Sequence, residues 1–117
     1  MRVVIFNEEL RSVMQMYLAL SNHFEVDIAE DEDDLMQMLA QNSADLTLLD
    51  LSDGENSQCD GPGWQVAGRI YKEHPEIKII GICDKTDEGM NTKAARHGIK
   101  EIVTRPIKNR ELLKVIG

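Results

Sequence analysis

Hydrophobic and polar positions repeat along the chain with two periods, one typical of buried strands and one typical of amphipathic helices. Apolar runs that predict strands lie at residues 3–6, 24–28, 46–51, 77–83 and 102–103. After these runs, apolar residues recur three and four positions apart, which predicts helices at residues 10–18, 33–41, 66–71, 90–95 and 112–116. The chain therefore alternates strand and helix, and we find no internal sequence repeat in it.

This alternation predicts an α/β fold, a doubly wound five-stranded parallel sheet with helices on both faces. Residues 24–28 alternate apolar and polar side chains as an edge strand does. Residues 3–6 are apolar throughout, as in a strand buried on both faces. Gly81 lies inside the fourth apolar run and predicts that another segment passes close to the backbone there. In such sheets, functional residues gather beyond the carboxyl ends of the strands.

The composition is that of one ordinary domain. The chain has 117 residues, 42% of them hydrophobic, which is enough for a single core over residues 1–117 without metal or disulfide staples. Cys59 and Cys83 are too few for a disulfide framework and lack zinc-ligand spacing, which favours the reducing cytoplasm. The longest apolar stretches are about five residues, far below the roughly twenty that span a bilayer, so we expect no membrane segment.

The charge argues against nucleic acid as a partner. A net charge of −8 would repel a phosphate backbone, and no Lys/Arg stripe offsets it along the sequence. The densest acidic run, Asp27–Asp34, precedes apolar residues at helical spacing. We interpret this run as the start of a helix, where carboxylates complement the helix dipole, in preference to a metal site. The three histidines share no spacing and are interpreted as solvated or locally bonded side chains.

Polar residues mark the carboxyl ends of four predicted strands, and we expect them to converge at one edge of the sheet. These residues are Asn7 and Glu8 after the first strand, Asp50 at the end of the third, Cys83 and Asp84 at the fourth, and Arg105 after the fifth. An acid at this rim is partly solvated, which makes its position at the end of an apolar run tolerable. Asp50 is therefore the central candidate.

Four segments of the chain, together spanning its length, resemble the receiver domains of bacterial two-component response regulators. "RVVIFNEE" resembles the first strand of that family with its acidic pair, and "DLTLLDL" resembles the third strand, which ends in the phosphoacceptor aspartate. "GWQVAGRI" resembles the start of the third helix, and "IVTRPI" resembles the fifth strand with its basic residue and proline. The resemblance implies a flavodoxin-like strand order, 2-1-3-4-5.

The resemblance also implies a chemistry for Asp50. In that family the aspartate is phosphorylated by a histidine kinase or a phosphorelay protein, and the altered surface engages a downstream effector protein or domain. Mg²⁺ would be held by Glu8 and Asp50, with Asn7 supplying an amide oxygen or a water-mediated contact and Ser52 a backbone carbonyl. The implied role is signalling, not enzymatic catalysis.

Arg105 and Cys83 take the two positions that contact the phosphoryl group in the family, and both depart from its usual residues. Arg105 replaces a lysine, which keeps the charge but changes an ammonium into a planar fork. Cys83 replaces a Ser or Thr hydroxyl by a thiol, which is a weaker hydrogen-bond donor. Asn7 replaces an acid, so we expect weakened Mg²⁺ binding. Ile102 replaces the Tyr or Phe that changes rotamer on activation.

Residues 52–62 form a segment about five residues longer than the usual connection, and they lack the usual proline soon after the aspartate. Their Gly, Ser, Asn and Asp content predicts a mobile loop at the rim of the site. Such a loop would admit a partner or shield Asp50. A cation-binding loop built from Asp53, Glu55 and Asp60 is the alternative, although the spacing is not that of an EF-hand.

Each site residue also has a structural interpretation that the sequence leaves open. Asp50 would cap the following loop, and Glu8 would favour a helix entrance without any metal. Cys83 would be a small buried residue at a strand end, with a reactive thiol as the alternative. Arg105 would pair with Glu101 or Glu111 on the surface.

We interpret the chain as an atypical receiver domain that signals through protein contacts of its fourth helix, fifth strand and fifth helix, a face that the resemblance supplies. A second interpretation is a pseudo-receiver, which docks partners without phosphorylation. A third is a flavodoxin-like nucleotide or flavin binder. Against the third, Gly61, Gly63 and Gly68 do not form G-x-G-x-x-G, and the first strand is not followed by a Gly-rich phosphate cradle.

Overall fold

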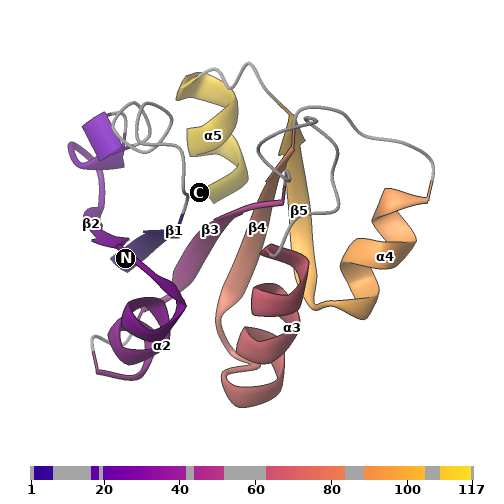
Figure 1. Cartoon of the computed structure of the whole chain (residues 1–117). Helices are drawn as coiled ribbons and strands as arrows, with labels where there is room; N and C mark the ends of the chain where they lie inside the picture. Colours follow the sequence, from indigo (N-terminus) through magenta and orange to yellow (C-terminus); the bar gives the residue numbers. More distant parts are fainter. Residues whose placement is uncertain are drawn as a thin grey trace.

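Five parallel strands form one sheet in the order β2-β1-β3-β4-β5 in a computed structural model of the chain (Figure 1). The structure describes residues 2–6, 17–18, 20–41, 44–51, 63–83, 89–104 and 109–116. The elements in chain order are β1 (Arg2–Phe6), β2 (Glu25–Ala29), α2 (Glu32–Gln41), β3 (Leu46–Asp50), α3 (Gly63–Glu73), β4 (Lys78–Cys83), α4 (Met90–Arg96), β5 (Ile99–Thr104) and α5 (Asn109–Ile116). The predicted strand order and the parallel pairing are confirmed.

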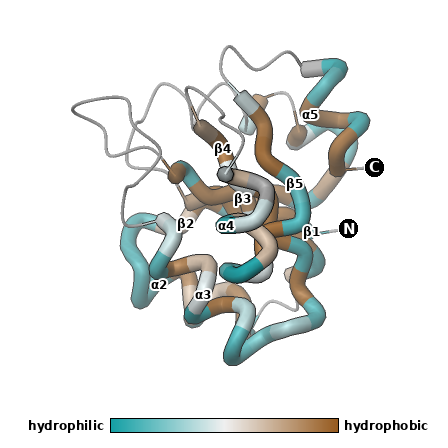
Figure 2. The backbone as a smooth tube through the Cα atoms, turned by 90° about the vertical axis from the view of Figure 1, so that its right-hand side faces the viewer, coloured by the Kyte–Doolittle hydropathy of each residue, from teal (hydrophilic) through white to brown (hydrophobic). Residues whose placement is uncertain are grey.

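Two layers of helices cover the two faces of this sheet (Figure 1). One face packs against α2, α3 and α4 through side chains such as Leu35, Trp64 and Met90. The other face packs against α5 and the segment around Leu20. Both layers arise from strands whose side chains are buried on either side, because parallel strands carry crossover helices on both faces. In Figure 2 the apolar stretches of the backbone concentrate on these inner strands.

The first predicted helix, residues 10–18, lies mostly outside the described residues. Tyr17, Leu18 and Leu20 are helical. Leu18, which the spacing placed on the apolar face, is 63% exposed, whereas Leu20 is fully buried. The described end of this segment is therefore helical, but the buried residue there is Leu20 and not Leu18.

The fifth strand is longer than the sequence predicted, because it begins at Ile99 and not at Ile102. Lys100 and Glu101 are exposed on this edge strand, so two adjacent polar residues concealed its first half. A register shift between Ile79 and Ile80 of β4 accommodates the extra residue of β5. An edge strand next to a bulge is thus the element that hydrophobic periodicity detects least well.

The later part of the acidic run, residues 30–34, starts a helix, as predicted, whereas Asp27 lies in β2. The backbone N–H of Asp34 donates a hydrogen bond of 2.7 Å to the Asp31 carboxylate, and the N–H of Glu30 donates one of 3.0 Å to the Asp34 carboxylate. These two side chains satisfy donors at the entrance of α2 that have no partner within the helix. Among the described residues, no cluster of three or more His, Cys, Asp or Glu side chains forms a metal site.

Gly98 follows the end of α4 and connects it to β5. Its φ angle is +77°, a conformation that glycine adopts without the penalty that other residues incur. A Cβ at this position would collide with the ring of Tyr71 on α3. The turn after α4 is thereby packed against α3.

Candidate functional site

The carboxyl ends of β1, β3, β4 and β5 lie along one edge of the sheet. Phe6 pairs with Leu49, and Asp50, the next residue of β3, pairs with Ile82. Ile82 in turn pairs with Val103 on β5. A residue that follows any of these strands therefore starts from the same edge as Asp50, which is the geometry that the sequence predicted.

Asp50 is the last residue of the central strand β3, and its side chain is half-buried. The following residue, Leu51, is fully buried, and its N–H donates a hydrogen bond of 2.8 Å to the carbonyl oxygen of Ile82. The ladder to β4 therefore continues one residue past Asp50. The Leu51 side chain lies over Gly81, where a Cβ would overlap it, so the close approach predicted at Gly81 is confirmed.

The amino end of α3 lies directly against the backbone of Asp50. A Cβ on Gly63 would collide with the Asp50 carbonyl oxygen, so only glycine permits this approach without a shift. This contact crosses the segment 52–62, which lies outside the described residues. Asp50 is thus fixed by hydrogen bonding to β4 on one side and by helix packing on the other.

Trp64, the second residue of α3, connects this end of the sheet to α4. Its indole is 3% exposed and packs edge-on against the ring of His97, with 5.3 Å between centroids. The Lys93 ammonium lies 4.3 Å from the centre of the Trp64 ring, a cation–π contact. His97 Nδ1 is held 2.8 Å from the Lys93 carbonyl oxygen. A continuous path of contacts therefore runs from the Asp50 carbonyl through Gly63 and Trp64 to α4.

Cys83 ends β4 and is fully buried, one position beyond the Asp50–Ile82 pair. It packs in the core on the face covered by α2, α3 and α4. Its sulfur is in a disulfide, and no cysteine in the described part of the chain is a free thiol. The expectation of a reduced thiol at Cys83 was therefore wrong. Two cysteines with no recognisable spacing in the sequence do not indicate whether their side chains meet in the fold. A disulfide sulfur has no hydrogen to donate, unlike the thiol expected at this position.

The other predicted site residues lie outside the described residues. Asn7 and Glu8 follow Phe6 in sequence, Ser52 follows Leu51, and Arg105 follows Thr104. Of the predicted phosphoacceptor, metal and phosphoryl-contact residues, the structure therefore describes Asp50 and Cys83. Asp50 pairs with Ile82 of the adjacent strand, and Cys83 directly follows Ile82, so the two residues lie at the same edge of the sheet, as predicted.

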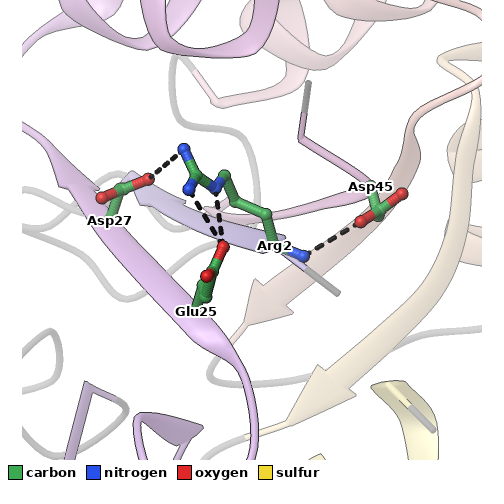
Figure 3. A network of polar contacts seen from close by, with 4 residues as sticks. All are labelled: Arg2, Glu25, Asp27 and Asp45. Carbon is green, nitrogen blue, oxygen red and sulfur yellow. Dashed lines mark hydrogen bonds and ion pairs between the residues drawn. The ribbon is translucent and has the colours of Figure 1, made fainter. Parts of the chain in front are cut away.

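The opposite edge of the sheet also carries acids, but there they surround an arginine (Figure 3). Arg2 Nη2 lies 2.9 Å from Glu25 Oε2, and Nη1 lies 3.8 Å from Asp27. The backbone N–H of Arg2 donates a hydrogen bond of 2.9 Å to the carboxylate of Asp45. Hydrogen bonding to Glu25 raises the pKa of Arg2 above its ordinary value. This cluster joins β1 to β2 and to the start of β3.

Besides the disulfide, two further features of the site were not predicted from the sequence. The sequence contains one sign of the contact between Gly63 and Asp50. A glycine stands at the first position of α3, where a helix does not require one. The contacts of Trp64 with Lys93 and His97 join positions that are about thirty residues apart in sequence. Periodicity describes one element at a time and carries no information about such pairs.

Comparison with known proteins identifies a family over nearly the whole chain. The sequence model of the response regulator receiver domain matches residues 6–117. No curated protein matches the chain. Solved structures with this fold, by contrast, are numerous.

A CheY-like response regulator receiver domain from Methanospirillum hungatei JF-1 has a TM-score of 0.81 at 19% identity, over 98% of this chain and 89% of that one. A response regulator from Thermotoga maritima has a TM-score of 0.80 at 20% identity, over 98% and 92%. NtrX from Brucella abortus has a TM-score of 0.82 at 22% identity over 98% of this chain. The match spans only 26% of NtrX, about a quarter of its length. With so few identical residues, these likenesses support the fold alone.

The part of the chain that the structure describes contains no helix with the length and apolar character needed to span a membrane.

Proposed function

The chain belongs to the family of response regulator receiver domains, and from this we propose that Asp50 accepts a phosphoryl group from a histidine kinase or a phosphorelay protein. Receiver domains act in two-component signal transduction, where they interact with kinases and effector domains. They are generally signalling domains and not enzymes. Within this class, the identity of the phosphoacceptor and the route of the signal are our proposals.

The observation that carries the proposal is the position of Asp50 at the carboxyl end of the central strand, with its backbone fixed on both sides. A carboxylate is a competent nucleophile toward phosphorus when it is held in place and reachable from solvent. The backbone contacts hold Asp50 in place, and its half-buried side chain is still partly accessible to solvent. A carboxylate oxygen would form the new bond to phosphorus while the bond to the donor breaks, which leaves an acyl phosphate on the chain.

The residue types around Asp50 fit a divalent cation, although less well than two acids after β1 would. The candidate ligands are all oxygen donors, namely Glu8, Asp50, the Asn7 amide and the Ser52 carbonyl, and Mg²⁺ prefers oxygen. Bound Mg²⁺ would neutralise charge on the phosphoryl oxygens. Because Asn7 is neutral, we propose that the affinity for Mg²⁺ is lower than in receivers with a complete acidic pair.

We propose that the signal leaves through α4, β5 and α5, and that it reaches α4 through Gly63 and Trp64. Ile102, half-buried on β5, has no aromatic ring to reorient, so the usual rotamer switch has no counterpart at this position. The contacts of Trp64 with Lys93 and His97 supply an alternative path on described residues. We also propose that residues 1–117 act as one domain. The sequence argument for a reducing cytoplasm no longer holds, because Cys83 is in a disulfide.

A second candidate function, the pseudo-receiver, is favoured by one observation. Cys83 occupies the position of the phosphoryl-binding hydroxyl and is in a disulfide, so it has no hydrogen with which to contact a phosphoryl oxygen. In this alternative the same face docks partners whether or not phosphate reaches Asp50.

Phosphorylation by a small donor separates these two functions. The chain is incubated with Mg²⁺ and acetyl phosphate, with and without reductant, and its intact mass is followed beside Asp50→Asn and Asp45→Asn. Asp45 is the matched control because it lies just before β3 and is bonded to the Arg2 backbone at the opposite edge. The receiver function predicts a gain of one phosphoryl group in wild type and Asp45→Asn only. No gain in any sample would contradict phosphorylation and support the pseudo-receiver.

A further inference from the structure

The charge of this chain is strongly polarised along the sheet. Residues 20–41, which include the edge strand β2 and α2, contain seven Asp or Glu and no Lys or Arg. Residues 89–116 contain seven Lys or Arg and two Glu, a net charge of +5. Because the whole chain has a net charge of −8, the other residues together carry −13. The sequence contains no basic stripe, but the fold brings the basic residues of three elements to one edge.

That edge is formed by β5, with α4 beside it (Figure 1) and with α5 on the other face of the sheet, where Leu112 belongs to the same core cluster as Val103 of β5. β5 pairs with β4 only, while α4 packs on one face of the sheet and α5 on the other. Exposed basic side chains lie on all three elements, namely Arg96 on α4, Lys100 on β5, and Arg110 and Lys114 on α5. We call these four residues the basic edge.

The basic edge is not engaged within the described part of the chain. None of its four side chains forms an ion pair or hydrogen bond with a described residue. By contrast, Arg2 pairs with Glu25 and Asp27, and Arg69 pairs with Glu32 and Glu73. Arg2 and Arg69, the described arginines remote from this edge, are thus neutralised inside the molecule, whereas the charge of the basic edge faces outward.

Helix stability explains only part of this charge. Arg96 and Lys114 lie in the last turns of their helices, where a cation complements the helix dipole. Arg110 lies in the first turn of α5, where a cation opposes the dipole, and Lys100 lies on a strand. These two positions have no local electrostatic reason to be basic.

We propose that the basic edge binds an acidic surface of a partner protein. Charge complementarity of this kind accelerates encounter and fixes the orientation of the partner. Half-buried Ile102 on β5 and Leu113 on α5 pack on opposite faces of the sheet, and each leaves some apolar surface on an element that carries these charges.

A protein fits this edge better than a nucleic acid does. Exposed Glu101 and Glu111 are interspersed among the basic residues and would face a continuous row of phosphates. The charge of −13 on the remaining residues also repels a long polyanion, whereas a compact acidic segment meets only the basic edge. The proposal deepens the proposed function, because it rests on α4, β5 and α5 as the output face and names the chemistry of what they bind.

The test uses a fluorescein-labelled amphipathic helical peptide whose polar face is entirely Glu, and its binding to the full chain is followed by fluorescence anisotropy. We expect binding that weakens as ionic strength rises. Lys100→Glu, Arg110→Glu and Lys114→Glu should each weaken it by about fivefold at low ionic strength. The matched control is Lys72→Glu on α3, which makes the same change in net charge at an exposed residue outside the basic edge and should change the affinity less than about twofold.

Three outcomes would overturn the proposal. The first is no binding of the acidic peptide, or an equal loss of affinity for it in Lys72→Glu and in the three variants of the basic edge. The second is tighter binding of a random-sequence DNA duplex than of the peptide at the same ionic strength, which would assign the edge to nucleic acid. The third is salt-sensitive self-association in sedimentation that the same edge variants abolish, which would assign it to the acidic edge of a second copy.

The result is independent of the phosphorylation assay. Peptide binding without phosphorylation of Asp50 would support this inference and contradict the switch, and phosphorylation without peptide binding would do the reverse. Circular dichroism of each variant establishes that the fold is retained before the affinities are compared.

Discussion

The two ends of the parallel strands carry the same kinds of residue and use them differently. At the amino-terminal edge, Glu25, Asp27 and Asp45 surround Arg2 and join neighbouring strands. At the carboxyl-terminal edge, Asp50 is held through its backbone, by the ladder to β4 and by the approach of α3. The backbone of Asp50 is fixed by main-chain contacts, while the carboxylates at the other edge themselves form the contacts.

This difference separates acids with a structural role from an acid that is positioned to react. An acid that bridges strands contributes to the structure through its charge, and exposed ion pairs of this kind contribute little. An acid whose backbone is fixed by other elements keeps its position when its side chain reacts. Substitutions at the two edges should therefore have unequal consequences, largest where they disturb the backbone of Asp50 and smallest where they remove the ion pairs of Arg2.

The largest effect is expected for Gly63→Ala. The added Cβ would collide with the Asp50 carbonyl oxygen, which is backbone and cannot rotate away. We expect a loss of about 3 kcal/mol in the free energy of unfolding, measured by chemical denaturation. Gly68→Ala on the same helix is the control, because its Cβ would lie 3.7 Å from His97 Cδ2, an ordinary contact. Equal stability of the two variants would contradict the close approach of α3 to Asp50.

Reduction of the disulfide should have the next largest effect. Within one chain the partner of Cys83 can only be Cys59, and the bond would close a loop of about 25 residues. We expect reductant to lower the free energy of unfolding by about 2–3 kcal/mol in wild type and to have no effect on Cys59→Ser. Peptide mapping under non-reducing conditions locates the bond. Two free thiols in the oxidised sample, or links only between chains, would contradict an internal bond at this edge.

Lys93→Met should have a smaller effect, because it removes the ammonium above the Trp64 ring and keeps the aliphatic stem. We expect a loss of about 0.5–1 kcal/mol in the free energy of unfolding. Trp64 is the single tryptophan of the chain, so its fluorescence should also change. Lys72→Met, at an exposed position of α3, serves as the control. An unchanged emission spectrum in Lys93→Met would show that the contact is not maintained in solution.

The smallest effect is expected at the amino-terminal edge. Arg2→Met removes the guanidinium and keeps an aliphatic side chain, and we expect a slight fall in melting temperature that disappears at high salt. Glu25 raises the pKa of Arg2 from a value already far above neutral. The contribution of this arginine is thus present at neutral pH and is lost in strong alkali, where the guanidinium loses its proton. A large fall in melting temperature that persists at high salt would show that the amino-terminal edge contributes as much to stability as the carboxyl-terminal edge.

The sheet could be predicted from the sequence because each buried strand is a short apolar run, and the order of the strands followed from the family resemblance. β5 was predicted too short because Lys100 and Glu101 face solvent on an edge strand. Leu18 was placed on a buried face and is exposed, because a helical period near the end of an element does not fix the orientation of its last turn.

The position of Asp50 at the carboxyl end of a central strand could be predicted because it directly follows an apolar run. The contacts that position it could not be predicted. Gly63 meets Asp50 across the segment 52–62, and Lys93 meets Trp64 across a strand and a turn. The charges of the basic edge are likewise dispersed in sequence, and only the packing of α4, β5 and α5 collects them.

The central claim is that the carboxylate at the end of β3 is the phosphoacceptor, and its most direct test is to locate the phosphoryl group. The chain is loaded with acetyl phosphate and Mg²⁺ and then treated with borohydride, which reduces an aspartyl phosphate to homoserine, and its peptides are sequenced by mass spectrometry. We predict homoserine at position 50 and at no other acid. Homoserine at Asp45 or any other aspartate, or a reduced glutamate at Glu8, with position 50 unchanged, would contradict the claim.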